Sequence, residues 1–238
     1  MRFPYVVGPP DRDTEKSGAI FLNPSFVAGK FKHGKFNKAR FSKAKFEKAK
    51  LSDSDFSNAA ILYSQGDLNT TFNGSKFIQT EIADSAFNDA IFDNTEFANT
   101  FISVTSFVGT SFQRSTFHNI TFNRVNAKQA NFLLLKIKRL VVNSGSIFDE
   151  ARFDRADIAD SHFEGVTFKG ASFFNATLRK TLFRNCDLSN VSFVSADLSH
   201  VTIENCDISG VDFSNVKSER TILSGNSGNP KNALKTSN

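Results

Sequence analysis

Residues 26–56 read FVAGKFKHGKFNKARFSKAKFEKAKLSDSDF, with a large apolar residue at every fifth position. The same period runs through most of the chain and is shifted by one residue after Ile61 and again after Phe132. Of the 28 Phe residues, 25 lie on this lattice, and the exceptions are Phe3, Phe101 and Phe174. One structural position is therefore filled by Phe again and again.

A second stripe of small residues runs two positions before the large ones, as in Ala39 before Phe41 and Ala196 before Leu198. A period of five fits neither an α-helix nor a single β-strand. Two inward residues in every five require a chain that turns a corner after each pentad, and four corners close a square coil of about 20 residues. Coils stacked at the strand spacing of about 4.8 Å pair their backbones in parallel. The period therefore predicts an all-β solenoid with a Phe-filled axis.

Some pentads carry a more specific signature: a small residue, Asp, Leu or Ile, and two variable residues. In this the chain resembles the pentapeptide-repeat family over roughly residues 20–216. The resemblance implies a right-handed, four-sided parallel β-helix, here with about nine to ten coils. The closest matches to the signature are Ala156-Asp157-Ile158-Ala159-Asp160, Cys186-Asp187-Leu188-Ser189-Asn190 and Ala196-Asp197-Leu198-Ser199-His200.

The period also sets the predicted organisation of the chain. Residues 1–20 are expected to cap the first coil, because the end of a solenoid exposes its core. Residues 21–216 form the repeat, with irregularities near residues 62–71 and 133–147, where the one-residue shifts fall. Residues 217–238 are expected to end the rod and to run into a polar, disordered tail.

Catalytic and metal-binding motifs are missing from the sequence. The histidines are scattered at outward positions, and none shares a motif with Cys, Asp or Glu at the spacing of metal ligands. Neither a phosphate-binding Gly loop nor a nucleophile elbow occurs, and a straight-sided rod offers little concavity for a small molecule. We therefore expect a protein that is not an enzyme and that has no cofactor, no metal and no small-molecule substrate.

Cys186 and Cys206 stand 20 residues apart in the small inward position, so we expect free, buried thiols on neighbouring coils.

No stretch is apolar enough to cross a membrane and no export signal is legible, so the expected location is cytoplasmic, with delivery as a secreted effector left open. The C-terminal segment lacks an apolar helix, which favours a monomer over a helix-mediated dimer.

Charge is banded along the chain, although the net charge is only +5. Residues 26–50 hold nine Lys and Arg against one Glu, whereas residues 51–120 hold eight Asp and Glu against two basic residues. Five-residue spacing carries the basic group around all four sides as a positive collar. The collar could bind nucleic acid, an anionic membrane or an acidic protein, or could only keep the rod soluble. Its residues just before a large one are Lys30, Lys35, Arg40, Lys45 and Lys50.

Residues 131–143 place apolar side chains at positions that elsewhere face water, beside basic residues. If the coil stays regular, they form an exposed apolar patch rimmed by positive charge, as docking sites do. If the inserted residue instead makes a bulge near Ser144-Gly145-Ser146, some of these apolar side chains turn inward and are buried. The candidate partner-binding residues are Leu133, Leu134, Lys136, Lys138, Arg139 and Val141.

Three functions remain open on the sequence alone. The leading expectation is a scaffold that mediates protein–protein interaction through its outer faces and bulges. The second follows from the resemblance, since well-known family members protect DNA gyrase, a type II topoisomerase, by mimicking duplex DNA with an acidic surface; the positive net charge of this chain departs from that pattern. The third is binding of nucleic acid or an anionic membrane surface through the collar, which would depend steeply on salt.

Overall fold

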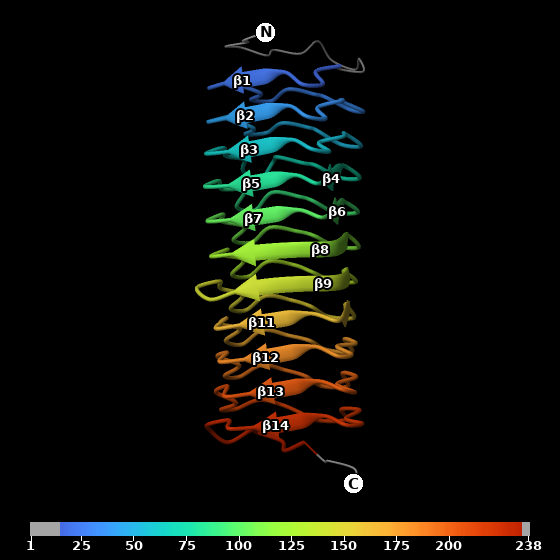
Figure 1. Ribbon diagram of the computed structural model, residues 1–238, viewed down its shortest axis with the longest axis vertical. Coiled ribbons are helices and arrows are strands. Elements are labelled where there is room, and N and C mark those ends of the chain that lie inside the picture. The colour runs from blue at the N-terminus through green and yellow to red at the C-terminus, as the bar shows by residue number, and fades with distance from the viewer. Residues whose placement is uncertain (1–14, 235–238) are drawn as a thin grey trace.

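The computed structural model describes residues 15–234, and within this range the chain is a rod of stacked coils without a helix (Figure 1). Residues paired between neighbouring coils lie 20 or 21 positions apart, as Phe21 pairs with Phe41 and Ile61 with Ile82. About ten turns stack in this way, and every strand pair is parallel, which confirms the predicted all-β solenoid. Most of the cap predicted at residues 1–20 lies outside the described residues.

The described residues form fourteen strands, most of them three residues long. Their bounds are β1 Ile20–Leu22, β2 Arg40–Ser42, β3 Ala60–Leu62, β4 Lys76–Ile78, β5 Glu81–Ala83, β6 Glu96–Ala98, β7 Phe101–Ser103, β8 Thr116–Asn123, β9 Lys136–Asn143, β10 Asp157–Ala159, β11 His162–Glu164, β12 Leu182–Arg184, β13 Thr202–Glu204 and β14 Ile222–Ser224.

Each coil has four faces, which we number by the core residues of the first coil: Phe21 on face 1, Phe26 on face 2, Phe31 on face 3 and Phe36 on face 4. Face 1 carries the path β1-β2-β3-β5-β7-β8-β9-β11-β12-β13-β14, the ladder of arrows in Figure 1. Strands β4, β6 and β10 lie on face 4. The eight-residue strands β8 and β9 begin on face 4 and cross the corner onto face 1.

Phe rings fill the axis in columns, one ring above another. Phe56 and Phe77 stack with centroids 5.0 Å apart and an interplanar angle of 2°. Within a coil the rings of adjacent faces meet edge to face, as Phe21 and Phe26 do at 71°. Both geometries suit the ring quadrupole, and each ring buries a large apolar surface. The period-five Phe lattice is thus a packing requirement imposed by the coil spacing.

The inward position two residues earlier stays small for two reasons. A Cβ at Gly29 would collide with the ring of Phe31, so space is short at the start of the rod. Further along, Ser and Thr hydroxyls donate to backbone carbonyls of the preceding coil, as Thr110 Oγ1 does to the carbonyl of Phe87 at 2.6 Å. Cys186 and Cys206 occupy this position as free, buried thiols on neighbouring coils, as expected.

Around β8 and β9 a small residue occupies one of the large inward positions, and larger residues occupy the small inward positions nearby. Ala127 stands where a Phe or Leu is usual, and large aliphatic residues fill the small position nearby. Leu135 and Leu140 are both buried there, so the apolar excess of residues 131–143 is divided between core and surface. The core is kept filled because total side-chain volume is conserved across neighbouring coils. The aliphatic residues that take the small position here are Ile120, Val125, Leu135 and Leu140.

The coil pairing also continues into the segment that the sequence predicted to be a disordered tail. Ser227 pairs with Asp207, and Asn232 pairs with Asp212. Leu234 packs against the core at the end of the described residues. Backbone pairing to the coil above, rather than side-chain hydrophobicity, accounts for this extension, because the segment itself is mostly polar.

Outside residues 66–70, the described pentads turn most of their corners through a residue in the left-handed region of φ. Gly, Asn and Asp dominate this position, as expected from their low cost there. Val104 is an exception with a φ of 46°, and Leu134 another with a φ of 59°. A β-branched residue is strained in this conformation, so Val104 lowers the stability of the rod.

Replacing Val104 by Asn should therefore raise the free energy of unfolding by about 1 kcal/mol. Urea denaturation of dilute protein followed by circular dichroism would measure it. Val27→Asn is the matched control, because Val27 is as exposed as Val104 but has no positive φ; its effect should stay within about 0.5 kcal/mol. Equal effects in the two variants would show that corner strain is not the cause.

Candidate partner-binding surface

Two bulges interrupt the outer surface, each made by one extra residue. Bulge 1, residues 66–70, has five residues where the coils above and below have four between the same paired positions. Gly66 stands at a core position, and the rings of Phe46 and Phe87 approach across it to 6.2 Å. Bulge 2, residues 144–146, follows β9 at the corner between faces 1 and 2. Both insertions are absorbed without a break in the ladder.

Bulge 1 is held by a hydrogen-bonded carboxylate. Asp67 accepts from the backbone N–H of Lys48 at 2.8 Å and from the hydroxyl of Thr70 at 2.9 Å. Partial burial acts to raise the pKa of Asp67, but hydrogen bonds from Lys48, Thr70 and Asn69 outweigh it and hold the pKa below its ordinary value of 3.8. Leu68 projects from the bulge with 66% of its surface exposed. A fixed turn therefore presents an apolar side chain to solvent.

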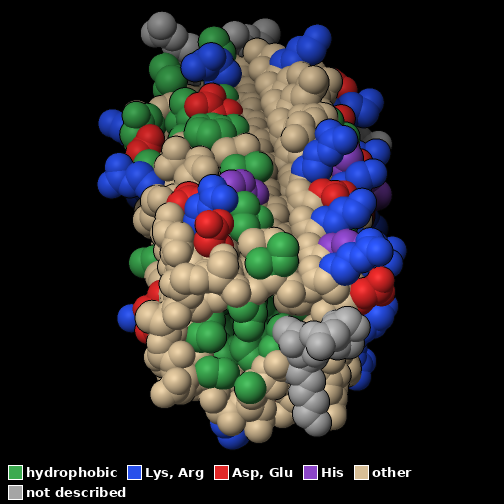
Figure 2. Space-filling view, turned by 60° about the horizontal axis from the view of Figure 1, so that its bottom comes forward, with side chains coloured by type: hydrophobic (Ala, Val, Ile, Leu, Met, Phe, Trp, Pro, Cys, Tyr) green, Lys and Arg blue, Asp and Glu red, His purple; other side chains and the backbone are tan. Residues whose placement is uncertain are grey.

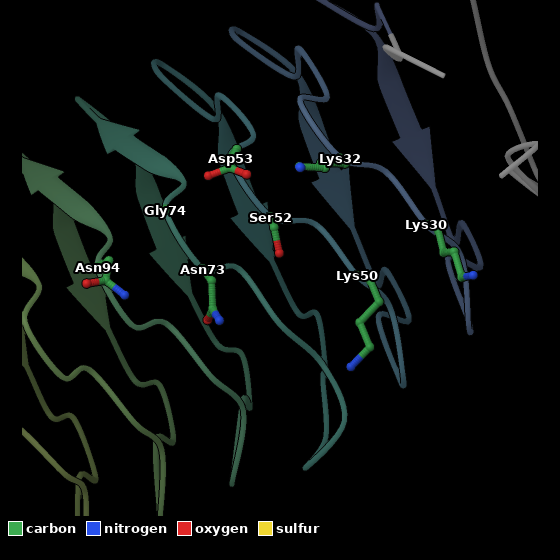
Figure 3. Close-up of a pocket in the computed structure, with 8 residues that line it drawn as sticks. All are labelled: Lys30, Lys32, Lys50, Ser52, Asp53, Asn73, Gly74 and Asn94. Carbon is green, nitrogen blue, oxygen red and sulfur yellow. The ribbon is translucent and has the colours of Figure 1, made fainter. Parts of the chain in front are cut away.

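A basic groove of about 510 Å³ lies on face 3 beside bulge 1 (Figure 3). Lys30 and Lys50 pair across neighbouring coils, and Lys32 lies near them at the N-terminal end of the groove. The Lys50 Nζ donates to the carbonyl of Asn69 in bulge 1 at 2.8 Å, which joins the bulge to the groove. The remaining lining residues on this face are Ser52, Asp53, Asn73, Gly74 and Asn94.

The structure divides the predicted collar among the faces. Lys30 and Lys50 share face 3, whereas Lys35 lies on face 4, Arg40 on face 1 and Lys45 on face 2. Lys35 is already paired with Glu15 at 3.4 Å. Only the two lysines on face 3 are brought together, because residues one coil apart, not one pentad apart, become neighbours.

The candidate residues between Leu133 and Val141 are likewise distributed. Leu133 and Leu134 lie on face 3 and its following corner, and Leu134 is 36% exposed. Lys136 and Lys138 lie on face 4 along a shallow groove of about 320 Å³. Arg139 turns the next corner, and Val141 lies on face 1. They therefore do not form one continuous patch.

Sequence reasoning missed an apolar strip on face 1. Phe101 is 43% exposed in the middle of that face, and Val104 and Tyr63 lie exposed along its edge. A groove of about 470 Å³ follows the same edge. The signal was present in the sequence, because Phe101 and Phe174 are two of the three Phe residues outside the lattice, and both face outward.

The C-terminal end of the described rod also exposes apolar surface, as Figure 2 shows for hydrophobic side chains gathered there. Val216, Leu223 and Leu234 are only partly buried against the core. A hollow of about 520 Å³ lies at this end beside Phe213 and Leu234.

The side chains that could bind a metal or act in catalysis are dispersed over the part of the chain that the structure describes. No group of three or more His, Cys, Asp and Glu residues comes close enough there to hold a metal ion. His162 Nε2 lies 3.4 Å from the carboxylate of Glu164 on its own strand. Among the same residues no helix could span a membrane.

Comparison with known proteins gives two family matches. Residues 144–213 match the pentapeptide repeat region, and residues 30–59 match pentapeptide repeats of eight copies. No curated protein matches the chain significantly.

Among solved structures, trypsin-treated QnrB1, a plasmid-mediated fluoroquinolone resistance protein, is 16% identical over 87% of this chain and 92% of its own, with a TM-score of 0.49. HetL from the cyanobacterium Nostoc, a pentapeptide repeat protein involved in heterocyst differentiation regulation, is 13% identical over 82% of this chain and 93% of its own, with a TM-score of 0.28.

The hydrogen-bonded carboxylate of Asp67 in bulge 1 makes the stability of the folded protein depend on pH. The pKa of Asp67 is lowered on folding, so its stabilisation is complete above the unfolded-state pKa of about 3.9 and is lost as the pH falls through the lower folded value. Asp67→Ala should lower the unfolding free energy by about 1 kcal/mol at neutral pH. The difference from wild type should shrink as the pH falls below about 4.

Urea denaturation across that pH range measures the effect. Glu81→Ala is the control, since Glu81 is exposed and its side chain has no hydrogen bond or ion pair with the described residues. A constant difference between Asp67→Ala and wild type at all pH values would contradict the role of the carboxylate.

Proposed function

The chain belongs to the pentapeptide-repeat family, and on that premise we propose that it is a non-catalytic scaffold that binds another protein through the basic groove and bulge 1. The observation that carries the proposal is the contact between Lys50 and Asn69, which places three lysines and an exposed Leu on one continuous surface. The complementary partner surface is an acidic segment with an apolar residue at its edge.

The interior supports a scaffold rather than an enzyme. Core Phe residues in the first coils are fully buried and stacked on one another, so the axis is occupied by side chains. The hollows on the surface are open grooves along the faces and corners. Binding energy must therefore come from the outside of the rod, where a fixed backbone presents side chains at regular spacing.

Protein binding fits this surface better than nucleic acid does. A nucleic-acid groove needs aromatic platforms or a long basic track. Here the aromatic rings of the first coils are buried, and the lysines of the groove are confined to its N-terminal end. Leu68 in bulge 1 adds the apolar contact typical of protein interfaces.

Mimicry of duplex DNA finds less support in the placement of the acidic side chains. The acidic residues between 81 and 96 pass around the coil, on faces 1, 3 and 4 and on two corners, rather than along one side. Asp93 is also engaged, because it accepts from the Ser111 hydroxyl at 2.6 Å and from the Gln113 N–H at 2.9 Å. A DNA mimic needs rows of free anionic groups along the rod.

Reversing two charges in the groove tests the proposal. Lys30→Glu combined with Lys50→Glu should lower the amount of partner captured from native cells at least about tenfold, because the acidic segment would then meet like charge. Leu68→Ser should lower it further when combined.

The control is Arg179→Glu with Lys180→Glu, which makes the same charge change at an exposed site on face 4. The proposal would be contradicted if the groove variant captured as much partner as wild type, or if the control variant lost as much partner as the groove variant. Binding of wild type to duplex DNA or to anionic vesicles, with no protein partner captured, would favour the polyanion function instead.

A further inference from the structure

The middle of face 1 is a flat parallel sheet with an unusually apolar outer side. Its rows are β3, β5, β7, the second half of β8 and the second half of β9. Phe101 and Val141 are 43% and 40% exposed on this surface, and Val104 is 47% exposed at its edge. Leu62 and Ala83, half-buried and buried, lie on the two rows that precede β7. Exposed apolar side chains that cluster on one face of a sheet indicate a surface that binds another molecule.

Three charged residues lie outward on these five rows or at the corner that follows them, Glu81, Asp84 and Arg124, and Arg139 stands at the corner that precedes the β9 row. Asp84 and Arg124 occupy the same corner position, one row to either side of β7. Neither side chain has an ion-pair or hydrogen-bond partner among the described residues, and both are exposed. Two opposite, unpartnered charges thus stand symmetrically about the row that carries Phe101 and Val104.

This symmetry is what a two-fold interface requires. If a second copy packs face to face about an axis parallel to β7, each row meets the row equally far on the other side of β7, and like positions meet. Phe101 then meets Phe101 of the partner subunit, and Asp84 meets Arg124 of the partner subunit. In the next rows Ala60 meets Val141 of the partner subunit. The exposed apolar residues Phe101, Val104 and Val141 thus face apolar residues, and the ion pair between Asp84 and Arg124 forms twice.

The other face-to-face arrangement is disfavoured by the same residues. An axis along the rod would place each row against itself with its direction reversed. Row β5 would then meet row β5 of the partner subunit, which brings Glu81 and Asp84 of both copies together with no basic residue on the row, and like charges in an interface repel. The charge pattern therefore selects the antiparallel arrangement.

We propose that face 1 is a self-association surface, on which a second copy of this chain packs antiparallel about a two-fold axis at β7. Sheets pack face to face about 10 Å apart, a separation that large side chains such as Phe101 can fill. About an axis at β7, nine rows of face 1 overlap, from β1 to β12, and their outer rows add the charged residues Arg40, Glu164 and Arg184. A strip about four residues wide over these nine rows covers on the order of 500 Å² on each protomer. The total, on the order of 1,000 Å², is at the lower limit for a specific interface, the range of weak and reversible association.

This inference goes beyond the proposed function and is independent of it. The basic groove lies on face 3, on the opposite side of the rod from face 1. A dimer through face 1 leaves both grooves open and pointing away from each other. Loss of self-association and loss of partner binding can therefore be measured separately.

Analytical ultracentrifugation of the full chain gives the first test. Wild type should reach twice the chain mass of 26.3 kDa as its concentration rises toward about 100 μM. Phe101→Asp should raise the dimer Kd at least about thirtyfold, because two rings are lost from the centre of the interface. Phe174→Asp is the matched control, a 40% exposed Phe on face 3, and should leave the Kd unchanged.

A charge exchange gives the second and more specific test. Asp84→Arg and Arg124→Asp should each weaken the dimer at least about tenfold, since each places like charges in contact. The two single variants should form a heterodimer when mixed, and the double variant should recover the wild-type Kd. The controls are Asp89→Arg and Arg114→Asp, which make the same changes at other corners.

Three results would overturn the proposal. The first is a chain that stays monomeric at about 100 μM. The second is a dimer that is unaffected by Phe101→Asp. The third is a set of single variants that do not recover association on mixing, which would place Asp84 and Arg124 apart in the dimer. Circular dichroism of each variant confirms that the rod is intact, as expected for side chains outside the core.

Discussion

The parallel backbone ladder is the constraint on which the rest of the molecule depends. It holds successive coils at the strand spacing of about 4.8 Å. Aromatic rings stacked one coil apart pack at nearly the same distance, since the ring centroids of Phe21 and Phe41 are 4.9 Å apart. The small position beside a ring therefore holds a wider side chain only where the core opens, as it does next to Ala127. Core composition, corner geometry and surface spacing all follow from this one distance.

Regular pairing also explains where irregularity is allowed. An extra residue at a corner can be pushed outward without disturbing the paired positions on either side, as both bulges do. Inside, the volume must be restored locally, and the exchange between Ala127 and its aliphatic neighbours achieves this. The interior is therefore uniform and the exterior variable, which is why specific recognition on this rod resides in side chains that the repeat itself does not require.

Much of the fold could be predicted from the sequence, because inward positions follow a fixed period and Phe marks them. The surfaces could not, since neighbours in space are 20 or 21 residues apart and the exact number depends on where each extra residue falls. Lys30 and Lys50 come together, whereas Lys35 and Arg40 do not. The burial of Leu135 and Leu140 was hidden for another reason: they fill positions that are small elsewhere, and only the neighbouring Ala127 explains the space.

The ladder also has a mechanical meaning. Its hydrogen bonds lie nearly parallel to the rod axis, so a load applied at the two ends acts directly on them. A coil at the end of the described ladder has one described neighbour rather than two, so it would peel before the interior coils and release about 20 residues of slack before the next coil bears the load. The rod would thus extend in equal steps, like a spring that unwinds one turn at a time, with the two 21-residue coils giving slightly longer steps.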